Sequence, residues 1–278
     1  MRRFHLSAIA LVVITCIGLS IDAQEPTTAG AYVQRGNSRQ SKDVAGAIAD
    51  YTKAIELDPR SADAYFHRGL LLFDKEAYDA AIADLSTVIT LDPKHANAYL
   101  WRGIARMNEY YAQPTKERSY ESALADFTQT IKLDPKHEEA YDNRGDLLLY
   151  EKHDYDLAIA DYTKAIAINS LDYQAYKGRG IARGKMTDYD GAIADLTASL
   201  DLVLDADSYS DRATFRRAKR DFIGAIEDYG KAIERAPKNP SYYRERATTY
   251  RAIHKTSLAE ADERTAGELE RSAGRKDH

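Results

Sequence analysis

The chain cannot form an internal disulfide, because its 278 residues include a single cysteine, Cys16, which lies within the first two dozen residues. A disulfide-stapled scaffold is therefore excluded, and stability must come from packing alone. Proline and glycine are also scarce, with 7 and 15 residues. Twenty tyrosines, together with many alanine, aspartate, lysine and leucine residues, favour an all-α fold over a sheet rich in valine and threonine.

Long runs of one charge are absent as well. The formal net charge is −5, lysine and arginine are interspersed with aspartate and glutamate, and no long basic run occurs. Binding to nucleic acid leaves an electrostatic footprint of clustered lysine and arginine, which this sequence does not have. We therefore expect no nucleic-acid partner.

The sequence also has none of the short motifs that carry catalysis or cofactor binding. It contains no GxxxxGK[ST] loop for phosphates, no GxGxxG pattern after a strand and no GxSxG elbow. His95 and His137 occur in equivalent DPKH segments, which favours exposed linker residues over metal ligands. We expect no metal, no cofactor and no enzymatic activity, although a catalytic site assembled across distant segments remains an alternative.

The first two dozen residues differ in chemistry from the rest. Arg2 and Arg3 precede an apolar run over residues 6–21, and Ala23 follows before a polar stretch. This layout is typical of a secretory signal peptide over residues 1–23, cleaved after Ala23, and predicts an exported, periplasmic protein. The alternative is a membrane anchor formed by residues 6–21, which is short of the roughly 20 residues that a spanning helix needs.

A repeated pattern fills the remainder of the chain. Seven tyrosines recur at separations of 33, 34, 42, 35, 33 and 34 residues: Tyr32, Tyr65, Tyr99, Tyr141, Tyr176, Tyr209 and Tyr243. Four residues after each tyrosine comes a small residue: Gly36, Gly69, Gly103, Gly145, Gly180, Ala213 and Ala247. Further along each unit an alanine is followed four residues later by a large apolar or aromatic residue, as in Ala158 and Tyr162. Spacings of four place each pair on one helical face, so each unit is predicted to be two antiparallel helices.

These recurring positions, here called columns, resemble the tetratricopeptide repeat. That repeat has an aromatic residue, a small residue four positions on, then Ala-x-x-x-aromatic and a closing proline, at a period of 34. The resemblance implies a right-handed α-solenoid of about seven stacked hairpins over residues 24–270, with a concave groove that binds peptides, and a polar tail over residues 271–278. The repeats lie near residues 29–60, 62–94, 96–136, 138–171, 173–204, 206–238 and 240–270. Repeat 3 carries extra residues around Pro114, and repeats 4 and 5 have Ser170 and Leu204 in place of the closing proline.

Two charged columns recur in every repeat. The arginines are Arg35, Arg68, Arg102, Arg144, Arg179, Arg212 and Arg246, and the aspartates are Asp50, Asp84, Asp126, Asp161, Asp195, Asp228 and Asp262. A side chain that every unit carries most simply serves the joint that every unit shares. We therefore predict arginine–aspartate pairs within or between neighbouring hairpins, with no direct part in binding.

Columns that vary between repeats are the candidates for a binding surface. The stripe at one, five and eight residues after each tyrosine is apolar in repeats 2 and 3, acidic at Asp142 and Asp146 in repeat 4, and basic farther on. The predicted partner-binding residues are Phe66, Leu70, Phe73, Leu100, Trp101, Ile104 and Met107, with Arg217, Arg244 and Arg251 as charged flanks. The alternative is that adjacent first helices bury this stripe against each other as core.

These columns predict a non-enzymatic scaffold that binds a protein or peptide with hydrophobic anchor residues, and they imply no small-molecule substrate. Some tetratricopeptide proteins grip a C-terminal carboxylate with a Lys and Asn clamp, but the matching positions here retain only one polar group of that set. A self-associating homodimeric solenoid is the second hypothesis, and an enzyme is a distant third.

Overall fold

The computed structural model describes residues 25–112 and 120–274, which form fourteen α-helices, one π-helical turn and no strand. The helices of the first four repeats are α1 (Ala29–Arg39), α2 (Val44–Leu57), α3 (Ala62–Asp74), α4 (Tyr78–Leu91), α5 (Ala96–Ala112), α6 (Tyr120–Leu133), α7 (Glu138–Leu147), the π-helical turn η1 (Leu148–Lys152) and α8 (Tyr155–Ile168). The others are α9 (Tyr173–Lys185), α10 (Tyr189–Leu202), α11 (Ala206–Ala218), α12 (Phe222–Arg235), α13 (Pro240–Ala252) and α14 (Thr256–Gly274).

Local sequence explains where these helices begin. The second helix of four hairpins starts after an aspartate whose carboxylate accepts a hydrogen bond from a backbone N–H in the first turn, as Asp43 does from Gly46 at 2.8 Å. Such N-caps satisfy a donor that the helix itself leaves free. In four hairpins the second helix ends at an Asp-Pro dipeptide or shortly before a proline, which cannot continue a helix.

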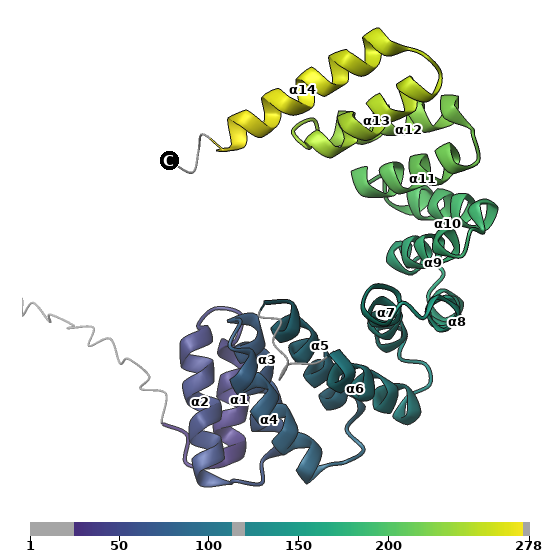
Figure 1. Cartoon of the computed structure of the whole chain (residues 1–278). Coiled ribbons are helices and arrows are strands. Elements are labelled where there is room, and N and C mark those ends of the chain that lie inside the picture. Colours follow the sequence, from purple (N-terminus) through teal and green to yellow (C-terminus); the bar gives the residue numbers. More distant parts are fainter. Residues whose placement is uncertain (1–24, 113–119, 275–278) are drawn as a thin grey trace, which may run out of the picture.

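Consecutive helices pack in pairs, and each pair packs on the next, so the chain forms a solenoid of helical hairpins. The hairpins follow one another along a curved arc, with α1 and α2 at one end and α14 at the other (Figure 1). In this view α5 and α7 lie toward the inside of the arc, and α6 and α8 toward the outside. The predicted all-α solenoid is confirmed.

The predicted signal peptide or anchor and the Pro114 loop lie outside the described residues. Of the predicted polar tail, the first residues continue α14 as far as Gly274, and the last four are not described. No helix within residues 25–112 and 120–274 is long and apolar enough to cross a lipid bilayer.

Each hairpin closes on the small residue of its first helix. A methyl group added at Gly145 would lie 2.9 Å from Cε1 of Tyr162, and one at Gly103 would lie 2.7 Å from Cε1 of Phe127. The alanine four residues before each of these rings is fully buried, as Ala158 is beneath Tyr162. The small residues therefore allow the close approach of two helices that the sequence predicted.

The prediction of arginine–aspartate pairs is confirmed in all seven repeats. The shortest N–O distances lie between 2.6 and 2.8 Å, and each pair joins the two helices of one hairpin. Five of the arginines also donate to a Ser or Thr hydroxyl on the preceding hairpin, as Arg144 does to Thr128 at 3.2 Å. Each arginine also lies over the tyrosine three residues before it. One side chain thus ties together both helices of its own hairpin and the neighbouring one.

Repeat 4 differs from the others within its first helix. Its tyrosine-to-tyrosine separation of 35 residues is accommodated by η1, a π-helical turn that extends α7 and ends at Lys152, with His153 as its C-cap. His153 has φ 57°, and the same left-handed conformation occurs at the hairpin turns of four other repeats, at Glu76, Thr187, Arg220 and His254. None of these five positions is a glycine, although glycine adopts this conformation at the lowest cost.

Candidate functional site

The predicted apolar residues divide into a buried and a partly exposed set. Leu100 and Ile104 are 2% and 8% exposed and belong to a core cluster with Phe127. They therefore stabilise the joint between repeats 3 and 4 and offer no surface to a partner, as the core interpretation of the stripe predicts. The partly exposed residues, here called the apolar patch, are Phe66, Leu70, Phe73, Trp101 and Met107 on α3 and α5.

Ring contacts hold the apolar patch in place. The ring centroids of Phe73 and Trp101 are 5.5 Å apart in an edge-to-face arrangement, and Phe66 lies 4.8 Å from His95. Phe73, Trp101 and Met107 also rest on the buried cluster beneath them. Packed rings lose little conformational freedom on binding, which favours affinity.

The predicted basic flanks are engaged in internal ion pairs. Arg217 of α11 pairs with Glu245 at 2.7 Å and lies over the Tyr229 ring. On α13, Arg244 pairs with a carboxylate of α14 at 2.6 Å, and Arg251 pairs with another at 2.9 Å. A partner carboxylate would have to compete with these internal carboxylates.

The column five residues after each tyrosine has a structural role that the sequence analysis missed. Where the second helix carries a buried tyrosine, this column is polar and binds its hydroxyl. Tyr51 donates to Asn37 at 2.7 Å, Tyr162 donates to Asp146 at 2.6 Å, and Thr214 and Tyr229 are 3.0 Å apart. Where the second helix carries Leu85, Phe127 or Leu196, the column is apolar: Leu70, Ile104 and Ile181. The two positions vary together, a signal that the sequence alone contains.

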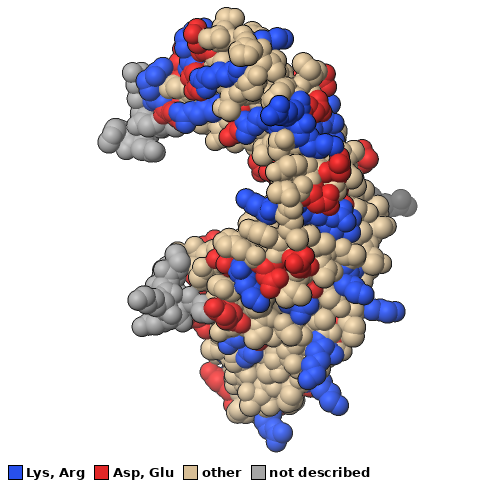
Figure 2. Space-filling model, turned by 45° about the vertical axis from the view of Figure 1, so that its right-hand side comes forward, with Lys and Arg blue, Asp and Glu red and all other residues tan. Residues whose placement is uncertain are grey.

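Between α7 and α9 lie four carboxylic acids, here called the acidic cluster: Glu138, Asp142, Asp146 and Asp172. Asp172 is the N-cap of α9, where one carboxylate oxygen accepts from the backbone N–H groups of Gln174 and Ala175 at 3.0 and 3.1 Å. The carboxyl groups of Glu138 and Asp142 both lie within hydrogen-bonding reach of Asp172. Figure 2 shows acidic side chains gathered on the inner side of the bend.

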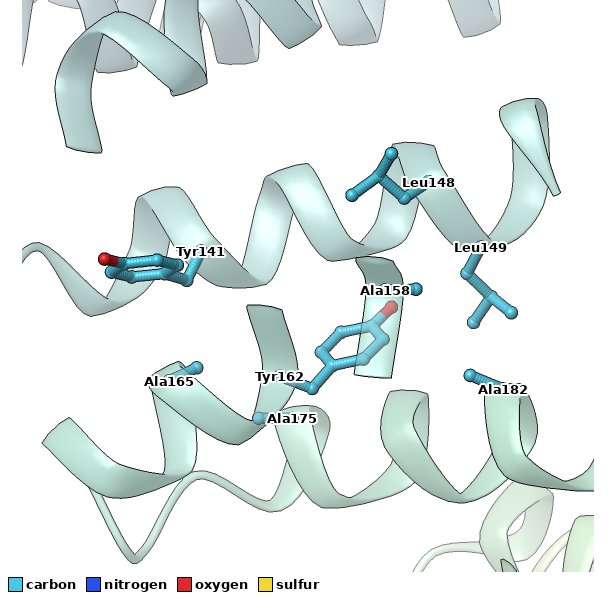
Figure 3. Close-up of a cluster of buried hydrophobic side chains, with 8 residues drawn as sticks. All are labelled: Tyr141, Leu148, Leu149, Ala158, Tyr162, Ala165, Ala175 and Ala182. Carbon is cyan, nitrogen blue, oxygen red and sulfur yellow. The ribbon is translucent and has the colours of Figure 1, made fainter. Parts of the chain in front are cut away.

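Burial and mutual repulsion raise the pKa values within the acidic cluster. Burial, followed by the charge of Asp172, raises the pKa of Asp142 to about 8. The hydrogen bond to Asp172, together with burial, raises the pKa of Glu138 to about 7. Burial also raises the pKa of Asp146, although the hydrogen bond from Tyr162 opposes this effect. Figure 3 shows Tyr162 among the buried residues beneath α7. Glu138 and Asp142 therefore hold a proton more tightly than ordinary carboxyl groups.

A cavity of about 420 Å³ lies between η1, α9 and α11. Its lining combines apolar groups such as Leu149 and Ile181 with charged ones such as Lys177, Asp207 and Asp211. Burial raises the pKa of Asp211 to about 6. The first helices of repeats 4 to 6 thus form a hollowed surface of mixed charge.

Within residues 25–112 and 120–274, no group of three or more His, Cys, Asp or Glu side chains is arranged to hold a metal ion. His137 contacts Asn97 on α5 of the preceding repeat at 3.1 Å, whereas His95 accepts from the backbone N–H of Ala98 in its own turn at 3.1 Å.

Two family models match the chain. The model described as "TPR repeat" matches residues 31–75 and 69–109, and the model described as "Tetratricopeptide repeat" matches residues 116–173. The chain therefore contains tetratricopeptide repeats, as the columns predicted, in a fold typical of protein-interaction scaffolds. No curated protein sequence matches the chain.

Solved structures, two of them described as TPR or tetratricopeptide repeat proteins, have the same fold. A protein from Parabacteroides merdae has a TM-score of 0.63 at 17% identity, covering 87% of this chain and 93% of its own. The protein YrrB, described as a TPR protein with an unusual peptide-binding site, has a TM-score of 0.57 at 22% identity, covering 67% and 92%. The crystal structure of MamA has a TM-score of 0.54 at 25% identity, covering 60% and 93%.

Proposed function

We propose that this chain is an exported, non-enzymatic scaffold that binds an extended protein or peptide segment on its concave face. The observation that carries the proposal is the apolar patch. Phe66, Phe73 and Trp101 are large rings held in fixed positions, yet they remain partly exposed on the first helices of repeats 2 and 3. Rigid, partly exposed aromatic rings are the residues that most often dominate binding energy at interfaces.

The repeat architecture supports the same function. The seven arginine–aspartate pairs and the buried small residues join the hairpins to one another. The positions that vary between repeats are therefore the ones available to bind a partner. The structure of YrrB shows that a solenoid of this fold can carry a peptide-binding site. Binding of a segment across several repeats is the recognition mode that we propose here.

Export is the second element of the proposal. It rests on the charged, apolar and small-residue layout of residues 1–23, with cleavage after Ala23 and the periplasm as destination. The N-terminal sequence of the chain recovered from cells tests it. A mature chain that starts at Gln24 supports export, whereas a chain that keeps residues 1–23 and stays with the membrane fraction supports the anchor.

The binding surface is tested by substituting Trp101. A peptide selected from a displayed library by the full chain serves as the ligand, and its affinity is measured by calorimetry. Trp101→Ala is expected to weaken binding by about 2 kcal/mol, roughly thirtyfold. Ile223→Ala on α12, whose side chain is 61% exposed, is the matched control and leaves affinity unchanged. The affinity of Phe66→Ala for the same peptide is a second measurement of the patch, which guards against the case that Trp101→Ala disturbs the core beneath it.

Self-association is the second candidate function, and a different set of residues favours it. Leu171 and Leu204, at the turns that lack a closing proline, are 71% and 53% exposed, and Ile168, Leu202 and Val203 beside them are exposed too. Light scattering distinguishes the two: a monomer supports the open surface, and a concentration-dependent dimer that Leu171→Asp dissolves supports self-association.

A further inference from the structure

The acidic cluster is unlike the other buried aspartates of the molecule. Each of the seven repeated aspartates has an arginine within 2.6 to 2.8 Å. By contrast, none of the groups that shift the pKa values of Glu138, Asp142 and Asp146 is a lysine or an arginine of the described residues. Carboxylates that are buried without a cation are costly, which makes this cluster an exception in need of a reason.

Apart from the other carboxyl groups of the cluster, two of its carboxylate oxygens have no hydrogen-bond partner. Asp172 is 9% exposed, and its Oδ2 is buried without a donor, while its Oδ1 serves the N-terminus of α9. Oδ1 of Asp142 is likewise buried without a donor among the described residues. Asp142 belongs to α7 and Asp172 caps the N-terminus of α9, so the two oxygens come from neighbouring first helices. Buried acceptors without donors are rare in native structures and indicate a missing partner.

We propose that the acidic cluster is the pocket for one cationic side chain, an arginine or a lysine, of the segment that the concave face binds. This inference rests on the proposed function and adds the chemistry of its ligand. A guanidinium group presents several N–H donors in a plane, so it can serve the free oxygens of Asp142 and Asp172 together. The seven arginine–aspartate joints of this chain show the same pairing between helices.

The position of the pocket defines the spacing of the ligand. The apolar patch lies on α3 and α5, and the acidic cluster lies between α7 and α9, about one repeat farther along. Packed helices lie about 10 Å apart, and an extended chain rises about 3.3 Å per residue. A segment with two apolar anchors therefore carries its basic residue about three to six positions from the nearer anchor.

A set of fluorescein-labelled synthetic peptides tests this inference on the full chain by fluorescence anisotropy. Each peptide has Phe and Leu anchors and one arginine three to six positions away, in either order. Its partner peptide has citrulline in place of arginine, which keeps the shape and removes the charge. The arginine peptide of the matching register is expected to bind about tenfold more tightly than its citrulline partner.

Variants of the chain identify the residues responsible. Asp142→Asn is expected to abolish the preference for arginine over citrulline while retaining citrulline-peptide binding. Glu227→Gln on α12 removes one exposed carboxylate elsewhere and retains the preference, which separates the pocket from the net charge. Equal binding of arginine and citrulline peptides overturns this inference and leaves the proposed function standing. Failure of every peptide to bind, or binding that Trp101→Ala does not weaken, overturns the proposed function itself.

Discussion

Gly145 provides a sharp test of how the hairpins close. A methyl group at this position would lie 2.9, 3.0 and 3.2 Å from three atoms of the Tyr162 ring. The ring has no room to retreat, because a methyl group at Gly178 on the next first helix would lie 2.4 Å from its Cζ. Its hydroxyl also donates to Asp146 at 2.6 Å. Tyr162 thus fills the space between two glycines on successive first helices.

The expected size of the effect follows from two opposing terms. Overpacking a filled core costs about 1–3 kcal/mol. Replacing glycine by alanine inside a helix recovers about 0.5–1 kcal/mol. Gly145→Ala is therefore expected to destabilise the protein by about 1 kcal/mol, within a range of about 0–2.5 kcal/mol. Gly230→Ala in α12 is the matched control, because the nearest neighbouring atom to its new methyl group is Arg246 Nη1 at 3.8 Å, so only the helical gain remains.

Urea denaturation followed by circular dichroism measures both variants against the parent chain. The midpoint is expected to fall for Gly145→Ala and to rise for Gly230→Ala. A Gly145→Ala protein at least as stable as Gly230→Ala would refute the close approach of α7 to the Tyr162 ring.

Two further changes have expected signs. Thr187→Gly is expected to stabilise the protein by about 0.5–1 kcal/mol, because Thr187 has φ 66°, a conformation that a β-branched residue adopts only with strain. Thr90→Gly within α4 is the control and is expected to destabilise the protein. The urea midpoints of both variants measure these effects. Asp142→Asn is expected to raise the melting temperature more at pH 8.5 than at pH 5. Asp142 is faced by the carboxyl groups of Glu138, Asp146 and Asp172 and by the Tyr162 hydroxyl, and its pKa is raised from 3.8 to about 8. The folded chain therefore binds the proton of Asp142 more tightly than the unfolded chain does. The parent protein loses stability as the pH rises from about 4 to about 8, and the asparagine variant does not have this loss. Each pKa unit corresponds to about 1.4 kcal/mol, so a difference of about 2 °C or more is expected, and equal melting shifts at both pH values would contradict it.

Much of the fold is predictable from the sequence because the same physical problem is solved in every repeat. A hairpin has to close on a small residue, cap its second helix and join its neighbour, so the residues that do this recur at a period of 34. The arginine and aspartate columns are the clearest case. Their constancy predicted a joint, and the structure places them between the two helices of each hairpin.

The candidate site is less predictable, because residues of one stripe have different surroundings. Leu100 and Ile104 lie on the same helical face as Met107, but only the packing of α5 on the following hairpin shows that the first two are buried. The acidic cluster depends on Asp172, which is 30 residues from Asp142 in the sequence and meets it only because α9 follows α7 in the arc. The dependence of Asn37, Asp146 and Thr214 on the tyrosine hydroxyls was visible in the sequence, since the two columns vary together.

The central claim is that an extended segment binds on the concave face, over the apolar patch. Trp101 is the only tryptophan of the chain and lies within that patch, so its emission reports directly on this surface. The most direct measurement is a titration of the full chain with the unlabelled arginine peptide of the matching register, recorded as tryptophan fluorescence. We predict a saturable blue shift of the Trp101 emission with the dissociation constant obtained from anisotropy. Binding that saturates while the emission of Trp101 stays unchanged would contradict the claim.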